Sequence, residues 1–190
     1  MIRLSQLLDE DWARLGVLAG TAHRQRRLWH SFNFRFAPVV LVRSAQCLYA
    51  AGWKRFAKFP ALVNSVLFGL EVPPRLPIGP GLVLTHTQGT VLGAASIGAN
   101  VTLYQQVTLG ARGMDFAYTL SLRPVLEDGV VVSAGAKVLG GLVLGQGCVV
   151  GANAVVLSDV PPGYVAMGVP ARNFPPKNER STHLAEAAKE

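Results

Sequence analysis

The chain has few cysteines and no long uninterrupted apolar segment, and each of these scarcities excludes a class of protein. Its 190 residues include two cysteines, Cys47 and Cys148, which lie in dissimilar segments. Two such residues cannot form a disulfide framework, so we expect both thiols to be free and packed inside the protein. Basic residues such as Arg43 and Lys54 interrupt the longest apolar stretches, so no membrane-spanning helix is expected.

Acidic residues are scarce in the first part of the chain, and the net charge of +7 is therefore unevenly distributed. Residues 1–76 hold eleven Lys and Arg against four Asp and Glu, whereas the remainder holds seven of each. A basic segment can meet nucleic acid, an anionic membrane surface or an anionic substrate. No nucleic-acid-binding motif accompanies the charge, so nucleic acid is not expected as a partner, and a solvated helical face is the simplest interpretation.

The first residues do not resemble a secretory signal, because Met1-Ile2-Arg3 is followed closely by acidic residues at 9–11. We therefore expect a cytoplasmic protein. Residues 1–72 are predicted to form helices, among them one within 36–51 that turns Arg43 and Gln46 outward. These helices are expected to pack on their own domain or on partner subunits. Contact with the inner membrane surface is the alternative, which the basic run Arg24, Arg26 and Arg27 would suit.

A period of six residues organises the rest of the chain. Every sixth residue from Leu126 to Val156 is aliphatic, and the same spacing appears within 78–84 and 97–109, with a one-residue slip near Thr90. A helix needs apolar spacings of three and four, and an ordinary strand alternates by two. The period of six instead predicts short strands and turns stacked into a parallel β-helix, with the repeated aliphatic side chains inside.

The repeats define three regions. The predicted β-helix domain covers residues 73–172, after the helical segment 1–72, and a polar tail covers 173–190. Residues 111–125 ignore the period, and an apolar excursion of this length is expected to cover a coil, a neighbouring subunit or a ligand cleft.

His86 is the only histidine between residues 31 and 182 and lies two places after a repeated aliphatic residue. It is either an ordinary surface residue or a general base, since an imidazole titrates near neutral pH. A metal site is not expected, because the β-helix carbonic anhydrases share the period but need three histidines around zinc. A base needs a carboxylate to orient it, and Glu71, fifteen residues earlier, is the nearest preceding one.

Several motifs resemble the serine acetyltransferase branch of the hexapeptide-repeat acyltransferases, especially its short forms and the related acetyltransferases of colanic-acid and capsule gene clusters. In chain order they are Glu71-Val72-Pro73-Pro74, Ile78-Gly79-Pro80-Gly81, Thr85-His86, Gln105-Gln106-Val107-Thr108-Leu109-Gly110, Gly135-Ala136-Lys137-Val138-Leu139-Gly140, Gly151-Ala152-Asn153-Ala154-Val155-Val156 and Gly168-Val169-Pro170-Ala171-Arg172. The resemblance implies a left-handed β-helix, a homotrimer with active sites between subunits, and acetyl-CoA as donor. It leaves open whether two trimers pair.

The resemblance also assigns roles to individual residues. It makes His86 the catalytic base and Glu71 its carboxylate partner. The residues expected to bind CoA are Gly110, Ala134, Lys137, Ala152 and Arg172, and those expected to bind the acceptor are Thr85, Gln105 and Arg123.

Two positions depart from the serine acetyltransferase pattern. Thr85 stands where that family has an aspartate, and Arg123 stands where it has a second histidine. Loss of the aspartate removes a charge-assisted contact to an ammonium group, worth roughly 1.5–3 kcal/mol. The chain also ends without the terminal isoleucine that binds cysteine synthase, so that complex is not expected. We therefore expect a sugar hydroxyl of an exopolysaccharide or capsule pathway as acceptor, with L-serine as the alternative and a non-catalytic scaffold as a second alternative.

Overall fold

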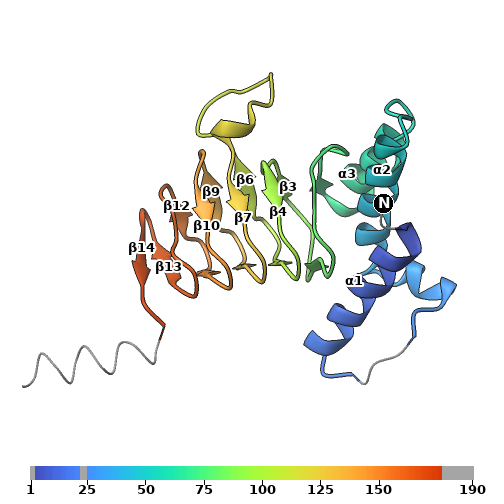
Figure 1. The fold of residues 1–190 in the computed structure, drawn as a ribbon, viewed down its shortest axis with the longest axis horizontal. Helices are drawn as coiled ribbons and strands as arrows, with labels where there is room; N and C mark the ends of the chain where they lie inside the picture. Colours follow the sequence, from blue (N-terminus) through green and yellow to red (C-terminus); the bar gives the residue numbers. More distant parts are fainter. Residues whose placement is uncertain (1–2, 22–24, 177–190) are drawn as a thin grey trace, which may run out of the picture.

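The computed structural model describes residues 3–21 and 25–176, which form a left-handed parallel β-helix with helices gathered at one end (Figure 1). The helices are α1 (Leu4–Leu18), η1 (Leu28–Phe32), α2 (Ala37–Ala50), α3 (Lys58–Phe68) and η2 (Leu120–Leu122). The strands are β1 (Leu70–Glu71), β2 (Val83–Leu84), β3 (Thr90–Leu92), β4 (Ser96–Ile97), β5 (Thr102–Leu103), β6 (Thr108–Gly110), β7 (Val125–Leu126), β8 (Val131–Val132), β9 (Lys137–Leu139), β10 (Val143–Leu144), β11 (Val149–Val150), β12 (Val155–Val156), β13 (Val165–Gly168) and β14 (Ala171–Phe174).

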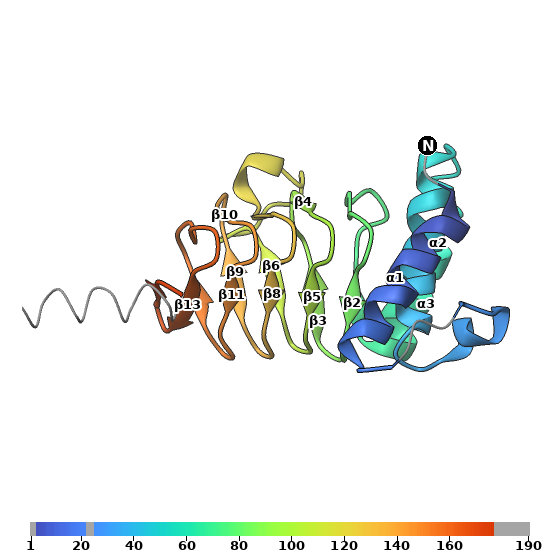
Figure 2. The same ribbon diagram turned by 60° about the horizontal axis from the view of Figure 1, so that its bottom comes forward.

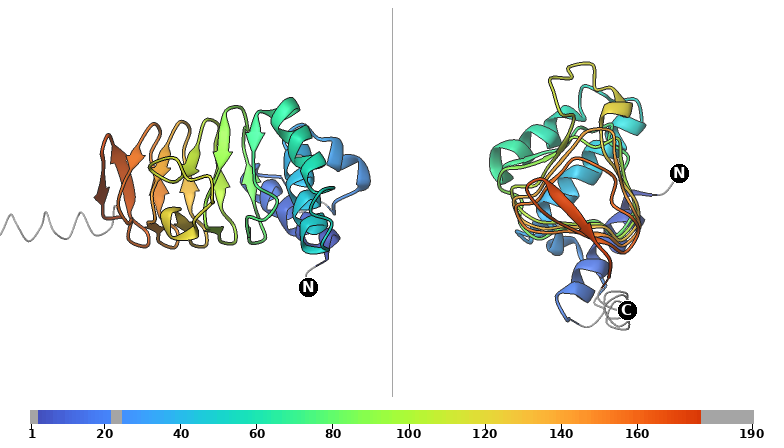
Figure 3. Two further views of the ribbon diagram at one scale, coloured as in Figure 1. Left: turned by 90° about the horizontal axis from the view of Figure 1, so that it is seen from above. Right: turned by 90° about the vertical axis from the view of Figure 1, so that its left-hand side faces the viewer.

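The strands form three sheets that wind around a common axis. Sheet A has the order β1-β3-β6-β9-β12, sheet B has β10-β7-β4, and sheet C has β14-β13-β11-β8-β5-β2. The chain passes from sheet C to A to B in each coil, and the coils stack in register (Figure 2). Seen along the axis, they superpose into a triangular outline (Figure 3). The period of six therefore corresponds to one side of the triangle, and the β-helix prediction is confirmed.

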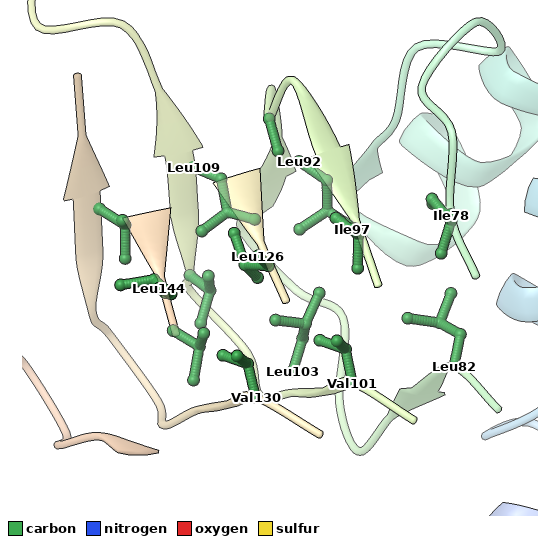
Figure 4. Packing of buried hydrophobic residues seen from close by; sticks show 14 of the residues in the cluster. Ile78, Leu82, Leu92, Ile97, Val101, Leu103, Leu109, Leu126, Val130 and Leu144 are labelled. Carbon is green, nitrogen blue, oxygen red and sulfur yellow. The ribbon is translucent and has the colours of Figure 1, made fainter. Parts of the chain in front are cut away.

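The repeated aliphatic side chains fill the interior. Figure 4 shows Leu92 and Leu109, from the neighbouring strands β3 and β6 of sheet A, and Leu126, from β7 of sheet B, in the interior, and each is at most 2% exposed. Each fully buried side chain of this size stabilises the fold by roughly 1.5–3 kcal/mol relative to exposure. Cys148 occupies one of these interior positions, and both cysteines are free thiols, as predicted.

The slip in the period is confirmed, and the structure shows its composition. Leu84 and Leu92, which occupy equivalent positions on sheets C and A, are eight residues apart instead of six. The next interior residue, Ile97, follows only five residues later. Relative to the period of six, two extra residues therefore precede Leu92 of β3, and one residue is missing after it.

The helices join the first coil through a buried polar network. Arg43 of α2 is fully buried, so the prediction that it faces outward is wrong. Its guanidinium donates to both carboxylate oxygens of Asp11, at 2.8 and 3.0 Å, and to the carbonyl oxygens of Ile78 and Gly79. Gln46, also predicted to face outward, donates to the Leu76 carbonyl at 2.6 Å. Paired charges and satisfied donors make this burial possible.

The limits of the elements differ slightly from the predicted regions. Sheet A begins at Leu70, inside the segment assigned to helices, and the β13–β14 hairpin extends to Phe174. Arg24 and residues 177–190 of the predicted tail lie outside the described residues. Within the described part of the chain, no helix combines the length and the apolar character needed to cross a bilayer.

Candidate active site

One edge of the β-helix collects half of the predicted site residues. This C–A edge is the row of corners where the chain turns from sheet C to sheet A, formed by residues 85–89, 104–107, 133–136 and 151–154. Backbone hydrogen bonds hold the corners above one another: the Thr85 N–H donates to Leu103 O at 3.1 Å, and the Ser133 N–H donates to Val150 O at 2.9 Å. Thr85, His86, Gln105, Ala134 and Ala152 therefore lie along a single edge.

His86 lies in the corner that contains the two extra residues, and it is exposed. The Thr87 hydroxyl donates to Phe68 O at 2.8 Å, and the Thr90 N–H donates to Gly69 O at 3.2 Å, so the end of α3 supports this corner from below. Gly69 has φ +59°, a backbone conformation that other L residues rarely adopt, so glycine is favoured at this position. The imidazole therefore lies on the surface of this longer corner.

Glu71 lies on sheet A next to this corner. It is exposed, its neighbours Leu70 and Val72 are buried, and its pairing partner in β3 is Val91. One full coil of the β-helix therefore places Val91, and not His86, directly beside Glu71. No hydrogen bond joins Glu71 to His86 in the described part of the chain, so their partnership stays a prediction.

Four of the five residues expected to bind CoA lie on the same edge or on sheet A beside it. A Cβ added to Gly110 would meet no atom within 4 Å, so the surface there is open. Lys137 donates to the Gln106 carbonyl, which keeps its side chain close to the C–A edge. Arg172 pairs with Met167 in the terminal hairpin, at the far end of sheet C. Four inter-strand steps of about 4.8 Å separate that hairpin from the strand before His86.

Arg123 lies elsewhere in the protomer, where the excursion 111–125 leaves sheet A and returns to sheet B. Its guanidinium donates to the Asp115 carboxylate at 2.9 Å and to Gly93 O at 2.9 Å, and it lies 3.6 Å from the centroid of the Tyr118 ring. Arg75 covers the same ring at 4.0 Å. Arg123 therefore holds the excursion in place, and its role toward an acceptor stays a prediction.

The contacts of Asp115 in this cluster lower the pKa of its carboxyl group. Burial acts to raise the pKa, but hydrogen bonds from the Thr119 backbone, Arg123 and the Thr119 hydroxyl, together with the charge of Arg123, outweigh it. The net pKa of Asp115 is lower than that of an ordinary aspartate. The carboxylate is thus stabilised in its charged form, in which it binds Arg123.

Sequence reasoning missed the residues that position the site. Thr87, Asp115 and Tyr118 support the histidine corner or the excursion, and none belongs to a motif or to the period. Gln105 was expected at the acceptor, and its side-chain carbonyl oxygen is buried without a hydrogen-bond partner within the described structure. In the same described residues, no three His, Cys, Asp or Glu side chains are arranged to hold a metal ion.

Comparisons with known proteins identify the family to which this left-handed β-helix belongs. The family described as "Bacterial transferase hexapeptide (six repeats)" matches residues 123–158. The chain is 40% identical over 137 residues to a serine acetyltransferase of Helicobacter pylori, covering 72% of this chain and 78% of that protein. The chain therefore belongs to the serine acetyltransferase branch of this superfamily.

Two further comparisons agree. A serine acetyltransferase of Mycobacterium tuberculosis is 38% identical over 131 residues, which are 68% of this chain and 56% of that protein. The chain thus spans little more than half of that relative. A solved serine acetyltransferase in complex with CoA superposes with a TM-score of 0.75 at 29% identity, covering 88% of this chain and 68% of that one.

These relatives correct the predicted acceptor. A sugar of a polysaccharide pathway is not supported, because the proteins at 38–40% identity are serine acetyltransferases. The sugar prediction rests on a few departures from the family pattern, among them Thr85 and Arg123, whereas the similarity extends over 137 residues. L-serine, the alternative acceptor, fits the comparisons better.

Proposed function

We propose that the protein transfers an acetyl group from acetyl-CoA to the hydroxyl of L-serine. The observation that carries the proposal is the position of His86, raised on the C–A edge of a fold whose relatives are serine acetyltransferases. An exposed imidazole on an open edge can reach a substrate that binds along the coils.

The chemistry assigned to His86 follows from the weak nucleophilicity of a neutral hydroxyl. The imidazole removes the proton as the serine oxygen attacks the thioester carbonyl, and a C–O bond forms. The C–S bond then breaks, and the proton passes from the imidazolium to the departing thiolate of CoA. General-base assistance of this kind contributes about 10²- to 10⁴-fold to the rate. Glu71 stabilises the imidazolium by its charge once the substrates order the site.

The C–A edge fits an extended, amide-bearing donor. Ala134 and Ala152 present small side chains at successive corners, and the surface at Gly110 is open. Acetyl-CoA supplies the activated acetyl group, and its pantetheine arm lies along the coils in contact with the backbone. Lys137 and Arg172 hold its phosphates toward the far end of the edge.

A homotrimer completes the site. His86 faces outward from a single protomer, and the excursion 111–125 projects from the triangular outline (Figure 3). Met114 and Phe116 at its tip are 91% and 95% exposed, which is unfavourable unless another surface covers them. A neighbouring protomer supplies the second wall of the cleft at His86. The pairing of two trimers stays an open alternative.

An acceptor panel tests the proposal. Release of CoA from acetyl-CoA is followed with L-serine, nucleotide-sugars and oligosaccharides, for the wild type, His86→Ala and the control His30→Ala. His30 stacks on Trp12 at 4.3 Å, far from the C–A edge in sequence and in contacts. Serine-dependent release that only His86→Ala abolishes supports the proposal. Equal, slow release by all three proteins with every acceptor supports a non-catalytic scaffold instead.

A further inference from the structure

The outer face of α3 carries an apolar surface that no part of the described chain covers. We define the α3 patch as six side chains that are 58–73% exposed: Trp53, Phe56, Phe59, Leu62, Val66 and Leu67. Trp53 and Phe56 precede the helix, and Phe59, Leu62 and Val66 recur at spacings of three and four, so these three side chains share one face of α3. A surface helix ordinarily turns polar residues outward, and a contiguous apolar face marks an interaction site.

The other face of α3 explains why the patch points outward. Pro60 and Asn64 are buried, and the Asn64 side chain donates to Pro38 O of α2 at 3.0 Å. The helix therefore packs on α2 through the face that carries Pro60 and Asn64. Rotating the patch inward would break this contact. Within the patch, the ring centroids of Trp53 and Phe56 lie 5.3 Å apart. The rings of Phe34 and Phe68, whose centroids lie 5.7 Å apart, add aromatic surface at the other end of α3.

The charge around the patch has one sign. Lys54, Arg55 and Lys58 alternate with its first aromatic residues and are exposed. No aspartate or glutamate occurs anywhere in residues 12–70. The ion pairs formed by the described residues of this end use Asp9 and Asp11, which precede that range, and they neutralise Arg26 and Arg43 only. The surface that surrounds the patch is therefore apolar and cationic.

We propose that the α3 patch binds the surface of an anionic lipid bilayer. Tryptophan and phenylalanine rings enter the boundary between headgroups and acyl chains, while lysine and arginine heads reach the lipid phosphates. Each basic side chain at an anionic membrane strengthens binding about fivefold. The alternation of aromatic and basic residues over 53–59 supplies both contributions within one short segment.

A second copy of the chain fits the patch less well. A twofold interface pairs the same surface from both copies. Every such pairing of the helical end would bring together cationic side chains without a carboxylate from residues 12–70 to neutralise them. An anionic bilayer has the opposite charge, and charge complementarity therefore favours lipid over a twofold pairing of this end of the chain.

The test is flotation of the full chain with phosphatidylcholine vesicles, with and without phosphatidylglycerol. We expect binding only to the vesicles that contain phosphatidylglycerol, and weaker binding as salt increases. Val66→Glu should weaken binding roughly tenfold or more, because it removes apolar burial and adds a repelled charge. Val169→Glu is the matched control, since Val169 is 72% exposed, Val66 is 73% exposed, and Val169 lies in the terminal hairpin region.

Three results would overturn the proposal: equal affinity for both kinds of vesicle, binding unchanged by Val66→Glu, or loss of binding in both variants. In a fourth result, the wild type does not bind vesicles but sediments as a larger oligomer than Val66→Glu. This result would show that the patch is an interface between copies of the chain. Release of CoA measured without lipid should be the same for Val66→Glu and the wild type. Failure of the lipid proposal is thus distinguishable from failure of the catalytic one.

Discussion

Asp11 and Arg43 form a bidentate ion pair whose two side chains are fully shielded from solvent, although they are 32 positions apart in the chain. The pair joins α1 to α2, and both partners extend the connection to the first coil. Asp11 accepts from the Leu82 N–H at 2.8 Å, and Arg43 donates to the carbonyl oxygens of Ile78 and Gly79. One ion pair thus attaches the helical end to the β-helix.

Removal of one partner should destabilise the protein strongly. Asp11→Asn leaves the Arg43 guanidinium buried without its counter-charge, which costs about 3–5 kcal/mol. Urea unfolding of Asp11→Asn, compared with Asp9→Asn, measures the effect. Asp9 is exposed and pairs with Arg26 in a surface ion pair, so Asp9→Asn should cost about 1 kcal/mol or less. Equal losses in the two variants would show that burial does not matter here.

Thr87 and Thr102 should respond oppositely to the same substitution. The Thr87 hydroxyl holds the histidine corner to Phe68 O, so Thr87→Val should cost about 1 kcal/mol and lower kcat more than it raises KM. The Thr102 hydroxyl is buried without a partner, so Thr102→Val should be neutral or stabilising and leave kcat unchanged. Thermal unfolding and serine-dependent CoA release measure both. A normal kcat in Thr87→Val contradicts the proposed support of His86.

The excursion 111–125 should detach in acid. The pKa of Asp115 is lowered in the folded protein, so its contribution to stability is present above the ordinary carboxyl pKa and is lost as the pH falls through the folded value. Hydrogen exchange at Leu120–Leu122, measured across that acidic range, should accelerate as the pH falls once the intrinsic rate is divided out. Asp115→Asn should show the accelerated exchange already at neutral pH. Equal protection of the wild type and Asp115→Asn against hydrogen exchange at neutral pH would show that the Asp115 contacts do not hold the excursion in place.

The two cysteines should differ in reactivity. Burial, followed by the negative charge of Glu127, raises the pKa of Cys148 to about 12, so its reactive thiolate is scarce near neutral pH. Cys47 is only partly buried. A maleimide reagent should therefore modify Cys47 in the native protein and both thiols in urea. Mass spectrometry of the labelled peptides gives the answer, and native labelling of Cys148 would mean that the interior coils open readily.

The sequence predicts the β-helix because each interior residue repeats at a fixed spacing, and this pattern does not depend on distant parts of the chain. It also predicts that His86 faces away from the packed interior, because His86 lies two places after a repeated aliphatic residue. It does not reveal the long corner, since the insertion before Leu92 and the deletion after it nearly cancel. Arg43 was misplaced because a helical pattern contains no information about a carboxylate 32 positions away.

The acceptor shows a different limit. Thr85 and Arg123 were weighed as ligands of the acceptor, and Arg123 proves to be occupied by Asp115, Gly93 and Tyr118. A single side chain compared with a family pattern does not disclose its contacts. The overall similarity to serine acetyltransferases, spread over many positions, was the better guide.

The last residues of α3 serve as a platform for the histidine corner, through Phe68 to Thr87 and through Gly69 to Thr90. Whatever docks on the outside of that helix is therefore separated from the imidazole by a single layer of chain. A shift of α3 along its axis would be transmitted through two hydrogen bonds to the reacting group. The last turn of α3 thus connects the outer surface of this helix with the corner that carries His86.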